Sequence, residues 1–105
     1  MKLEDIMPEL AREFEAGLRE IGEVKLANTV SGLEITGRCE CGDNNCGTFY
    51  TQDKEVWSGK KLRQAVPTVK GLYAVDVFEN EVVCIEILDR EDVSEKLNQL
   101  FQIRT

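Results

Sequence analysis

Two runs of alternating apolar and polar residues near the C-terminus constrain the fold most strongly. They are LYAVDVF, residues 72–78, and VVCIEIL, residues 82–88, with residues 79–81 between them. Alternation with a period of two is typical of a strand buried on one face, and a short connection between two such runs predicts an antiparallel β-hairpin. The predicted core face consists of the inward residues of both strands: Tyr73, Val75, Val77, Val83, Ile85 and Ile87.

The shared core face fixes the register of this hairpin, because a slip of one residue would turn every side chain to the other face. Val77 then pairs with Val83, and residues 79–81 form a three-residue loop. Loops of this length contain one residue in the left-handed conformation. We expect that residue to be Asn80 or Glu81.

Amphipathic helices are predicted at both ends of the chain. Apolar residues recur at helical spacing near the N-terminus, and Pro8 and Gly22 suit a first helical turn and the residue after a last turn, so a helix is predicted from about Pro8 to Ile21. A second helix is predicted after Asp89, which suits an N-cap. The helical residues expected in the core are Leu10, Phe14, Leu18, Leu97 and Phe101.

Short alternating runs at residues 24–26, 33–36 and 48–51 predict further strands, and residues 28–32 predict a turn. Residues 52–70 show no period, and we predict no element there. Strands between terminal helices define an α+β fold. The prediction is therefore an antiparallel β-sheet with an N-terminal and a C-terminal amphipathic helix packed on one face, in a single domain of residues 1–105.

Three of the four cysteines lie within eight positions, in the stretch GRCECGDNNCGTF. Cys39 and Cys41 are two residues apart, so in extended chain both side chains point to the same side. The glycine- and asparagine-rich segment after them is short enough to return Cys46 towards them. Cys84 lies on the predicted hairpin face opposite the core, beside Asp76 and Glu86.

Several interpretations of these cysteines stay open. Zinc takes four tetrahedral ligands with Zn–S bonds of about 2.3 Å, so Cys39, Cys41, Cys46 and Cys84 are candidate zinc ligands. Alternatively, the glycines form a tight hairpin whose cysteines are small and inert. Redox or cluster chemistry is the third interpretation. Asp76 and Glu86 are either an acid pair or part of a solvated strand face.

The net charge of −7 is unevenly distributed. Residues 54–70 hold five basic side chains and one acidic one, so the rest of the chain is strongly acidic. An acidic surface repels nucleic acid and attracts a basic protein. We predict a basic protein partner, no nucleic acid and no membrane, with Glu91, Asp92 and Glu95 as candidate contact residues.

The composition disfavours an enzyme. The chain contains no histidine, so a serine or cysteine nucleophile lacks its usual base. The glycines match neither a phosphate-binding loop nor a dinucleotide fingerprint. No long apolar run or signal-like start is present, which predicts a cytoplasmic location. In that reducing compartment cysteines are expected as free thiols or metal ligands.

Two stretches of the sequence resemble parts of known bacterial proteins. GRCECGDNNCGTFYT, residues 37–51, is similar to a cysteine-rich motif of small uncharacterised bacterial proteins, and residues 71–92 resemble their hairpin-then-helix pattern. The resemblance covers about a third of the chain. It implies a bacterial cytoplasmic origin and transfers no activity or catalytic residue.

Two classes of function follow, with a third behind them. The first is a small acidic binding protein without enzymatic activity, of the kind that masks a basic toxin or nuclease as an immunity protein does. The second is a zinc-stabilised accessory domain in which the cysteine-rich loop is structural. The third is a thiol-redox protein that forms a reducible bond between Cys39 and Cys41.

Overall fold

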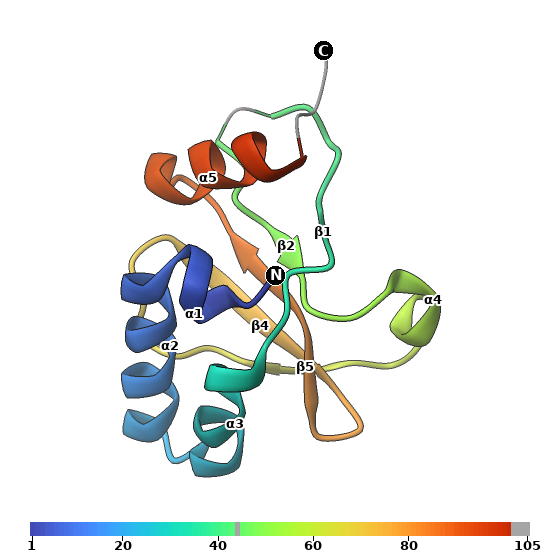
Figure 1. The fold of residues 1–105 in the computed structure, drawn as a ribbon. Coiled ribbons are helices and arrows are strands. Elements are labelled where there is room, and N and C mark those ends of the chain that lie inside the picture. The colour runs from blue at the N-terminus through green and yellow to red at the C-terminus, as the bar shows by residue number, and fades with distance from the viewer. Residues whose placement is uncertain (44, 102–105) are drawn as a thin grey trace.

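The structure is a computed structural model that describes residues 1–43 and 45–101. Its strands form one antiparallel sheet in the order β1-β2-β5-β4-β3, with the helices of the chain arranged around it (Figure 1). The strands are β1 (Gly37–Arg38), β2 (Phe49–Tyr50), β3 (Arg63–Ala65), β4 (Leu72–Phe78) and β5 (Glu81–Ile87). The helices are α1 (Leu3–Ile6), α2 (Pro8–Glu20), α3 (Val24–Thr29), α4 (Lys54–Trp57) and α5 (Glu91–Phe101), with a 3₁₀ turn at Val30–Gly32. The predicted α+β class is confirmed.

The hairpin β4–β5 forms as predicted, but its register differs. Val77 pairs with Val82 instead of Val83, and Phe78 pairs with Glu81. A bulge between the Asp76–Cys84 and Val77–Val82 pairs leaves Val83 without a partner in β4. The connecting loop is the two residues Glu79 and Asn80, both with positive φ. The predicted three-residue loop was wrong because a bulge inserts an unpaired residue into a strand, and simple alternation gives no sign of it.

A second irregularity in β4 corrects another predicted core residue. The register shifts between Leu72 and Ala74, and the side chain of Tyr73 is 60% exposed. Leu72 packs against the core in its place. Val83 is fully buried but lies outside the main core cluster, where Val82 replaces it.

The predicted terminal helices are present. α2 begins at Pro8, ends at Glu20 and is followed by Gly22 with φ of +83°, as expected. α5 begins at Glu91, and Asp89 has φ of +64°, so Asp89 is not the N-cap that the sequence predicted. The backbone carbonyl of Arg90 instead accepts the N–H of Ser94 at the start of the helix.

The strand predicted at residues 24–26 was wrong, because Val24–Thr29 is helical. Leu26 and Ala27 bury their side chains against the core, so packing selects a helix for a segment too short to show its own period. The strand predicted at residues 33–36 is reduced to one bridge between Lys2 and Glu34. β2 lies within the run predicted at residues 48–51.

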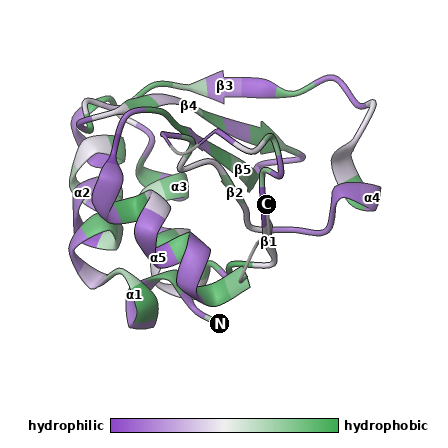
Figure 2. Cartoon of the chain, turned by 90° about the horizontal axis from the view of Figure 1, so that it is seen from above, coloured by the Kyte–Doolittle hydropathy of each residue, from purple (hydrophilic) through white to green (hydrophobic). Residues whose placement is uncertain are grey.

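One hydrophobic cluster joins the helices to the sheet. Its members on β4 and β5 include Val75, Val77, Ile85 and Ile87, and Leu10, Phe14, Leu18 and Leu97 join them from α2 and α5. Phe101 is only partly buried against it. β4 and β5 are predominantly apolar, whereas β3 is mostly hydrophilic (Figure 2). Among the described residues, no helix is long and apolar enough to cross a membrane.

Residues 52–70, for which the sequence predicts no element, contain α4 and β3. The half-buried Trp57 ring lies 5.5 Å from the ring of Tyr50, centroid to centroid, and its indole N–H donates to the carbonyl of Gln52 at 3.1 Å. Trp57 therefore packs against Tyr50 of β2.

Candidate metal centre

The predicted convergence of three cysteines is confirmed. Cys39 follows β1, Cys46 precedes β2, and Cys41 lies in the loop between them. Their Sγ atoms all lie within 4.8 Å of one another. Two Zn–S bonds of about 2.3 Å each join sulfur atoms at a similar separation, so a single zinc ion could contact all three after a small movement. Cys46 is buried, Cys39 half-buried and Cys41 exposed, so the cluster opens to solvent at Cys41. These three thiols are positioned to hold a metal ion.

Local turn chemistry closes the cysteine loop. Gly42 has φ of +80°, a conformation that glycine adopts without steric cost. The Asp43 carboxylate accepts the backbone N–H of Asn45 at 2.9 Å, and the Asp43 carbonyl accepts the N–H of Cys46 at 3.1 Å. An aspartate that bonds the backbone two residues ahead is a common turn device. It returns the chain from Cys41 to Cys46.

The loop is also fastened to the segment that links β5 to α5. The N–H of Gly47 donates to the carbonyl of Ile87 at 2.9 Å, and the N–H of Asp89 donates to the carbonyl of Asn45 at 3.0 Å. A Cβ atom at Gly47 would lie 3.1 Å from Val93 and 3.2 Å from Ile87. A side chain at this position would require Val93 or Ile87 to shift by a few tenths of an ångström, because the loop lies close to β5 and α5.

Arg38 is the residue of this site that sequence reasoning missed. Its guanidinium donates to the carbonyl of Cys46 at 2.6 Å and to the carbonyl of Cys39 at 3.1 Å, and a third bond reaches the side-chain oxygen of Asn98 on α5. Arg38 is only 7% exposed and pairs with the core residue Phe49. No sequence pattern indicates this inward position, which follows from the pairing with Phe49, and a buried charge requires the partners that Arg38 finds here.

The thiols differ in their electrostatic surroundings. The backbone N–H of Asp43 donates to the Cys41 sulfur, and this bond, with the neighbouring thiols, lowers the pKa of Cys41. Burial raises the pKa of Cys39, against the opposing effect of a hydrogen bond from the Cys41 backbone. Thiolates are soft ligands that select zinc, copper(I) or iron–sulfur clusters. The chain contains no histidine, so a nitrogen ligand from imidazole is excluded.

Cys84 is the predicted ligand that the structure does not bring into this group. It lies on β5 between Tyr50 of β2 and Asp76 of β4, and it is 4% exposed. Because β2 separates β1 from β5 and neighbouring strands lie about 4.8 Å apart, the backbones of β1 and β5 are about 10 Å apart. Burial, followed by the charge of Asp76, raises the pKa of Cys84.

Cys84 has the acidic neighbours that the sequence predicted. Asp76 is directly opposite it in the sheet and only 6% exposed, so the solvated-face interpretation fails for this residue. The Gln64 side-chain amide donates to Asp76 at 3.0 Å and to Glu86 at 3.5 Å. Burial and the adjacent Asp76 carboxyl raise the pKa of Glu86 to about 7. The two carboxyl groups form a pair bridged by Gln64.

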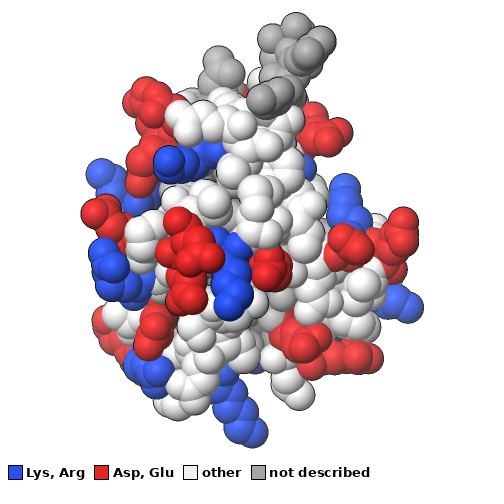
Figure 3. Space-filling view, in the orientation of Figure 1, with Lys and Arg blue, Asp and Glu red and all other residues white. Residues whose placement is uncertain are grey.

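The candidate partner-binding residues Glu91, Asp92 and Glu95 lie exposed on α5. Asp92 pairs with Arg90 at 2.7 Å, and Arg90 also pairs with Glu13 at 2.9 Å. The Arg90 hydrogen bond lowers the pKa of Asp92. Acidic and basic side chains are interspersed on the face seen in Figure 3. The basic partner stays a prediction, tested by the salt dependence of its association.

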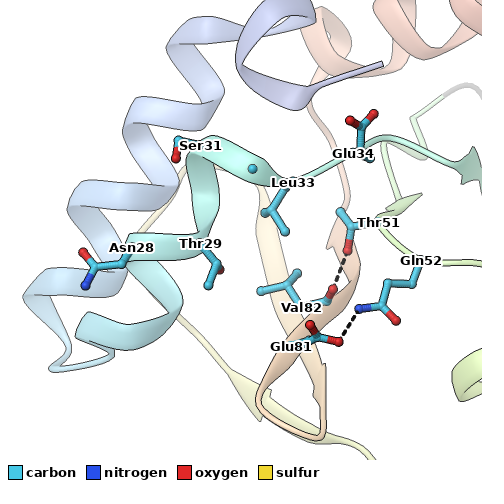
Figure 4. A pocket seen from close by; sticks show the side chains of 10 residues that line it. Asn28, Thr29, Ser31, Leu33, Glu34, Thr51, Gln52, Glu81 and Val82 are labelled. Atoms are coloured by element: carbon cyan, nitrogen blue, oxygen red, sulfur yellow. Dashed lines mark hydrogen bonds between the residues drawn. The ribbon is translucent and has the colours of Figure 1, made fainter.

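A cavity of about 380 Å³ lies between the α3 region and the ends of β2 and β5 (Figure 4). Several of its polar side chains are already bonded to neighbours. The Thr51 hydroxyl donates to the Val82 carbonyl at 2.6 Å, and the Gln52 amide donates to Glu81 at 3.0 Å. Because these side chains already bond to the protein, they are less available to bind a ligand than the thiols of the cysteine cluster.

Comparison of the chain with protein-family models, with curated proteins and with solved structures found no match. The resemblance to small bacterial proteins therefore stays a prediction.

Proposed function

We propose that this protein is a zinc-binding domain whose metal is held by Cys39, Cys41 and Cys46. The observation that carries the proposal is the mutual approach of the three sulfur atoms to within 4.8 Å. As Zn²⁺ binds, each thiol that coordinates it loses its proton to solvent, and three thiolate–zinc bonds form. A structural zinc site takes four ligands, so a fourth donor from outside these three thiols would be required at the exposed side of Cys41.

The proposed role of the metal is structural, and we propose no enzymatic activity. Zinc would add a further restraint to the loop between β1 and β2. The hydrogen bonds of Asp43 and Gly47 already restrain this loop. Binding to a preformed site stabilises the folded protein, because the unfolded chain lacks that site. In this role the domain would serve a larger assembly, and the acidic surface of α5 is one candidate for its contacts.

The test is the zinc content of protein purified without chelator, together with zinc affinity measured by competition with a chromophoric chelator. We expect about one zinc per chain in the wild type and its loss in Cys46→Ser. Cys84→Ser is the matched control, since it removes a buried thiol outside the cluster. Wild-type protein that neither contains nor binds zinc would contradict the proposal.

A thiol-redox role is the second candidate, because the exposed Cys41 lies beside two other thiols. In this case a peroxide oxidises two thiols to one disulfide and is itself reduced to water or an alcohol. Intact mass spectrometry of the zinc-free protein distinguishes the two functions. A redox protein forms one reversible disulfide within the cluster at low peroxide concentration, and bound zinc suppresses this reaction.

A further inference from the structure

The two carbonyls that Arg38 binds belong to Cys39 and Cys46, the first and last residues of the cluster. These residues are seven positions apart, and one rigid, planar guanidinium therefore fixes the separation of the two backbone segments that carry their thiols. The hydrogen bonds come from a charged donor that is 7% exposed, so they are stronger than neutral bonds in water.

The same guanidinium reaches the side chain of Asn98 on α5. Asn98 lies sixty positions from Arg38 in the sequence, and the bond connects the cysteine loop to the last turn of the helix. The packing of Gly47 against Val93 makes a second connection at the first turns of the same helix. The cluster and α5 are therefore held together at two separate points.

We propose that Arg38 is a positioning residue for the metal site and that, through Asn98, it couples metal binding to the docking of α5. The inference rests on the proposed zinc function. Groups that orient metal ligands without touching the metal change metal affinity by about 10- to 100-fold when they are removed. Coupling of this kind is reciprocal, so metal binding must stabilise α5 as much as α5 strengthens metal binding.

Three variants separate this role from a general loss of stability. Arg38→Gln removes the charge, and Asn98→Ala removes only the α5 end of the connection. Gln99→Ala is the matched control, because Gln99 is the exposed neighbour of Asn98 on the same helix. The readouts are zinc affinity, the sulfur-to-cobalt charge-transfer band of the Co²⁺-loaded protein, and hydrogen exchange of the α5 amides with and without zinc.

We expect zinc affinity to fall about 10- to 100-fold in Arg38→Gln and about fivefold in Asn98→Ala, with no change in Gln99→Ala. The charge-transfer band should shift in Arg38→Gln. Zinc should slow exchange of the α5 amides in the wild type and in Gln99→Ala, but much less in Asn98→Ala. Equal zinc affinity and equal protection in Asn98→Ala and the wild type would overturn the coupling. If Arg38→Gln fails to fold, Asn98→Ala still decides. Wild-type protein that binds neither metal would instead overturn the zinc function itself.

Discussion

The four cysteines divide into two environments that differ in backbone structure and in how closely their sulfur atoms approach one another. Cys39, Cys41 and Cys46 lie in a loop whose turns bring their sulfur atoms within 4.8 Å of one another, with one thiol open to solvent. Cys84 is 4% exposed within a long strand, and burial raises the pKa of its thiol. The loop thiols are free to converge because their backbone turns, whereas the sheet fixes Cys84 two strands away from β1.

The comparison shows that neighbourhood in the fold, rather than residue type, decides whether a thiol can be a ligand. A metal requires deprotonated sulfur at a common point. The loop supplies that point, and the backbone N–H of Asp43 lowers the pKa of Cys41, whereas burial raises the pKa of Cys39. Burial, followed by the charges of Asp76 and Glu86, raises the pKa of Cys84, which lies away from that point.

The strand that carries Cys84 should be the more costly region to disturb. Ile85→Ala removes a side chain that is 1% exposed in the core, and we expect a loss of about 2–5 kcal/mol in the free energy of unfolding. Urea denaturation measures this value. Val56→Ala, at an exposed position of α4, should change it by less than about 0.5 kcal/mol. A loss below about 1 kcal/mol for Ile85→Ala would show that the core face of β5 is wrongly assigned.

The stabilisation of the protein by zinc should depend on the loop cysteines and not on Cys84. At a free zinc concentration 100 times the dissociation constant, the wild type should gain about 2.7 kcal/mol. Cys84→Ser should gain the same amount over its own metal-free form, and Cys39→Ser should gain little. Thermal denaturation of each protein with and without zinc gives the comparison. If the zinc-dependent gain in stability disappears in Cys84→Ser, Cys84 is a zinc ligand and the separation of Cys84 from the loop cysteines is wrong.

The close approach of the loop to β5 should be measurable without metal. Gly47→Ala places a Cβ about 3.1 Å from Val93, so we expect a loss of about 1–3 kcal/mol from overpacking. Gly32→Ala is the control, since a Cβ at Gly32 meets no atom within 4 Å. If both variants unfold at the same urea concentration as the wild type, the loop is not packed against Val93 and Ile87 as described.

The acid pair beside Cys84 should give a smaller, pH-dependent effect. The pKa of Glu86 rises from 4.5 to about 7, so the folded protein holds a proton that the unfolded chain has released across this window. The contribution of this proton to the free energy of unfolding is fully present below pH 4.5 and is lost as the pH rises through 7. Glu86→Gln should therefore reduce the loss of stability between these values, by an amount limited by solvent screening at this half-buried group.

The control for this pH dependence is Glu55→Gln, at an exposed position of α4. It should leave the pH profile of stability unchanged. Unfolding curves that respond to pH identically in the wild type and in Glu86→Gln would show that Asp76 and Glu86 do not share a buried environment.

Local pattern predicted the elements that have strong periods. The two runs at residues 72–88 and the apolar stripe after Pro8 gave β4, β5 and α2, since alternation and helical spacing depend on the sequence alone. Convergence of the loop cysteines was also predictable, because the short spacing and the turn residues restrict the chain locally. The bulges that expose Tyr73 and bring Val82 into the core leave no such signal.

Long-range partners account for the other differences. Val24–Thr29 has too few residues for its period to be distinguished from a strand, and its burial against α2 and the sheet decides the outcome. Arg38 depends on Asn98, sixty positions away, and no local rule connects them. The same holds for Cys84, because its position relative to the loop depends on the strand order, with β2 between β1 and β5.

X-ray absorption at the zinc edge of the loaded wild-type protein tests the division of the cysteines most directly, because it counts the sulfur neighbours of the metal. We predict three sulfur atoms at about 2.3 Å and one lighter donor, and the same spectrum in Cys84→Ser. Four sulfur neighbours in the wild type that fall to three in Cys84→Ser would contradict the account, and so would a zinc ion bound without sulfur.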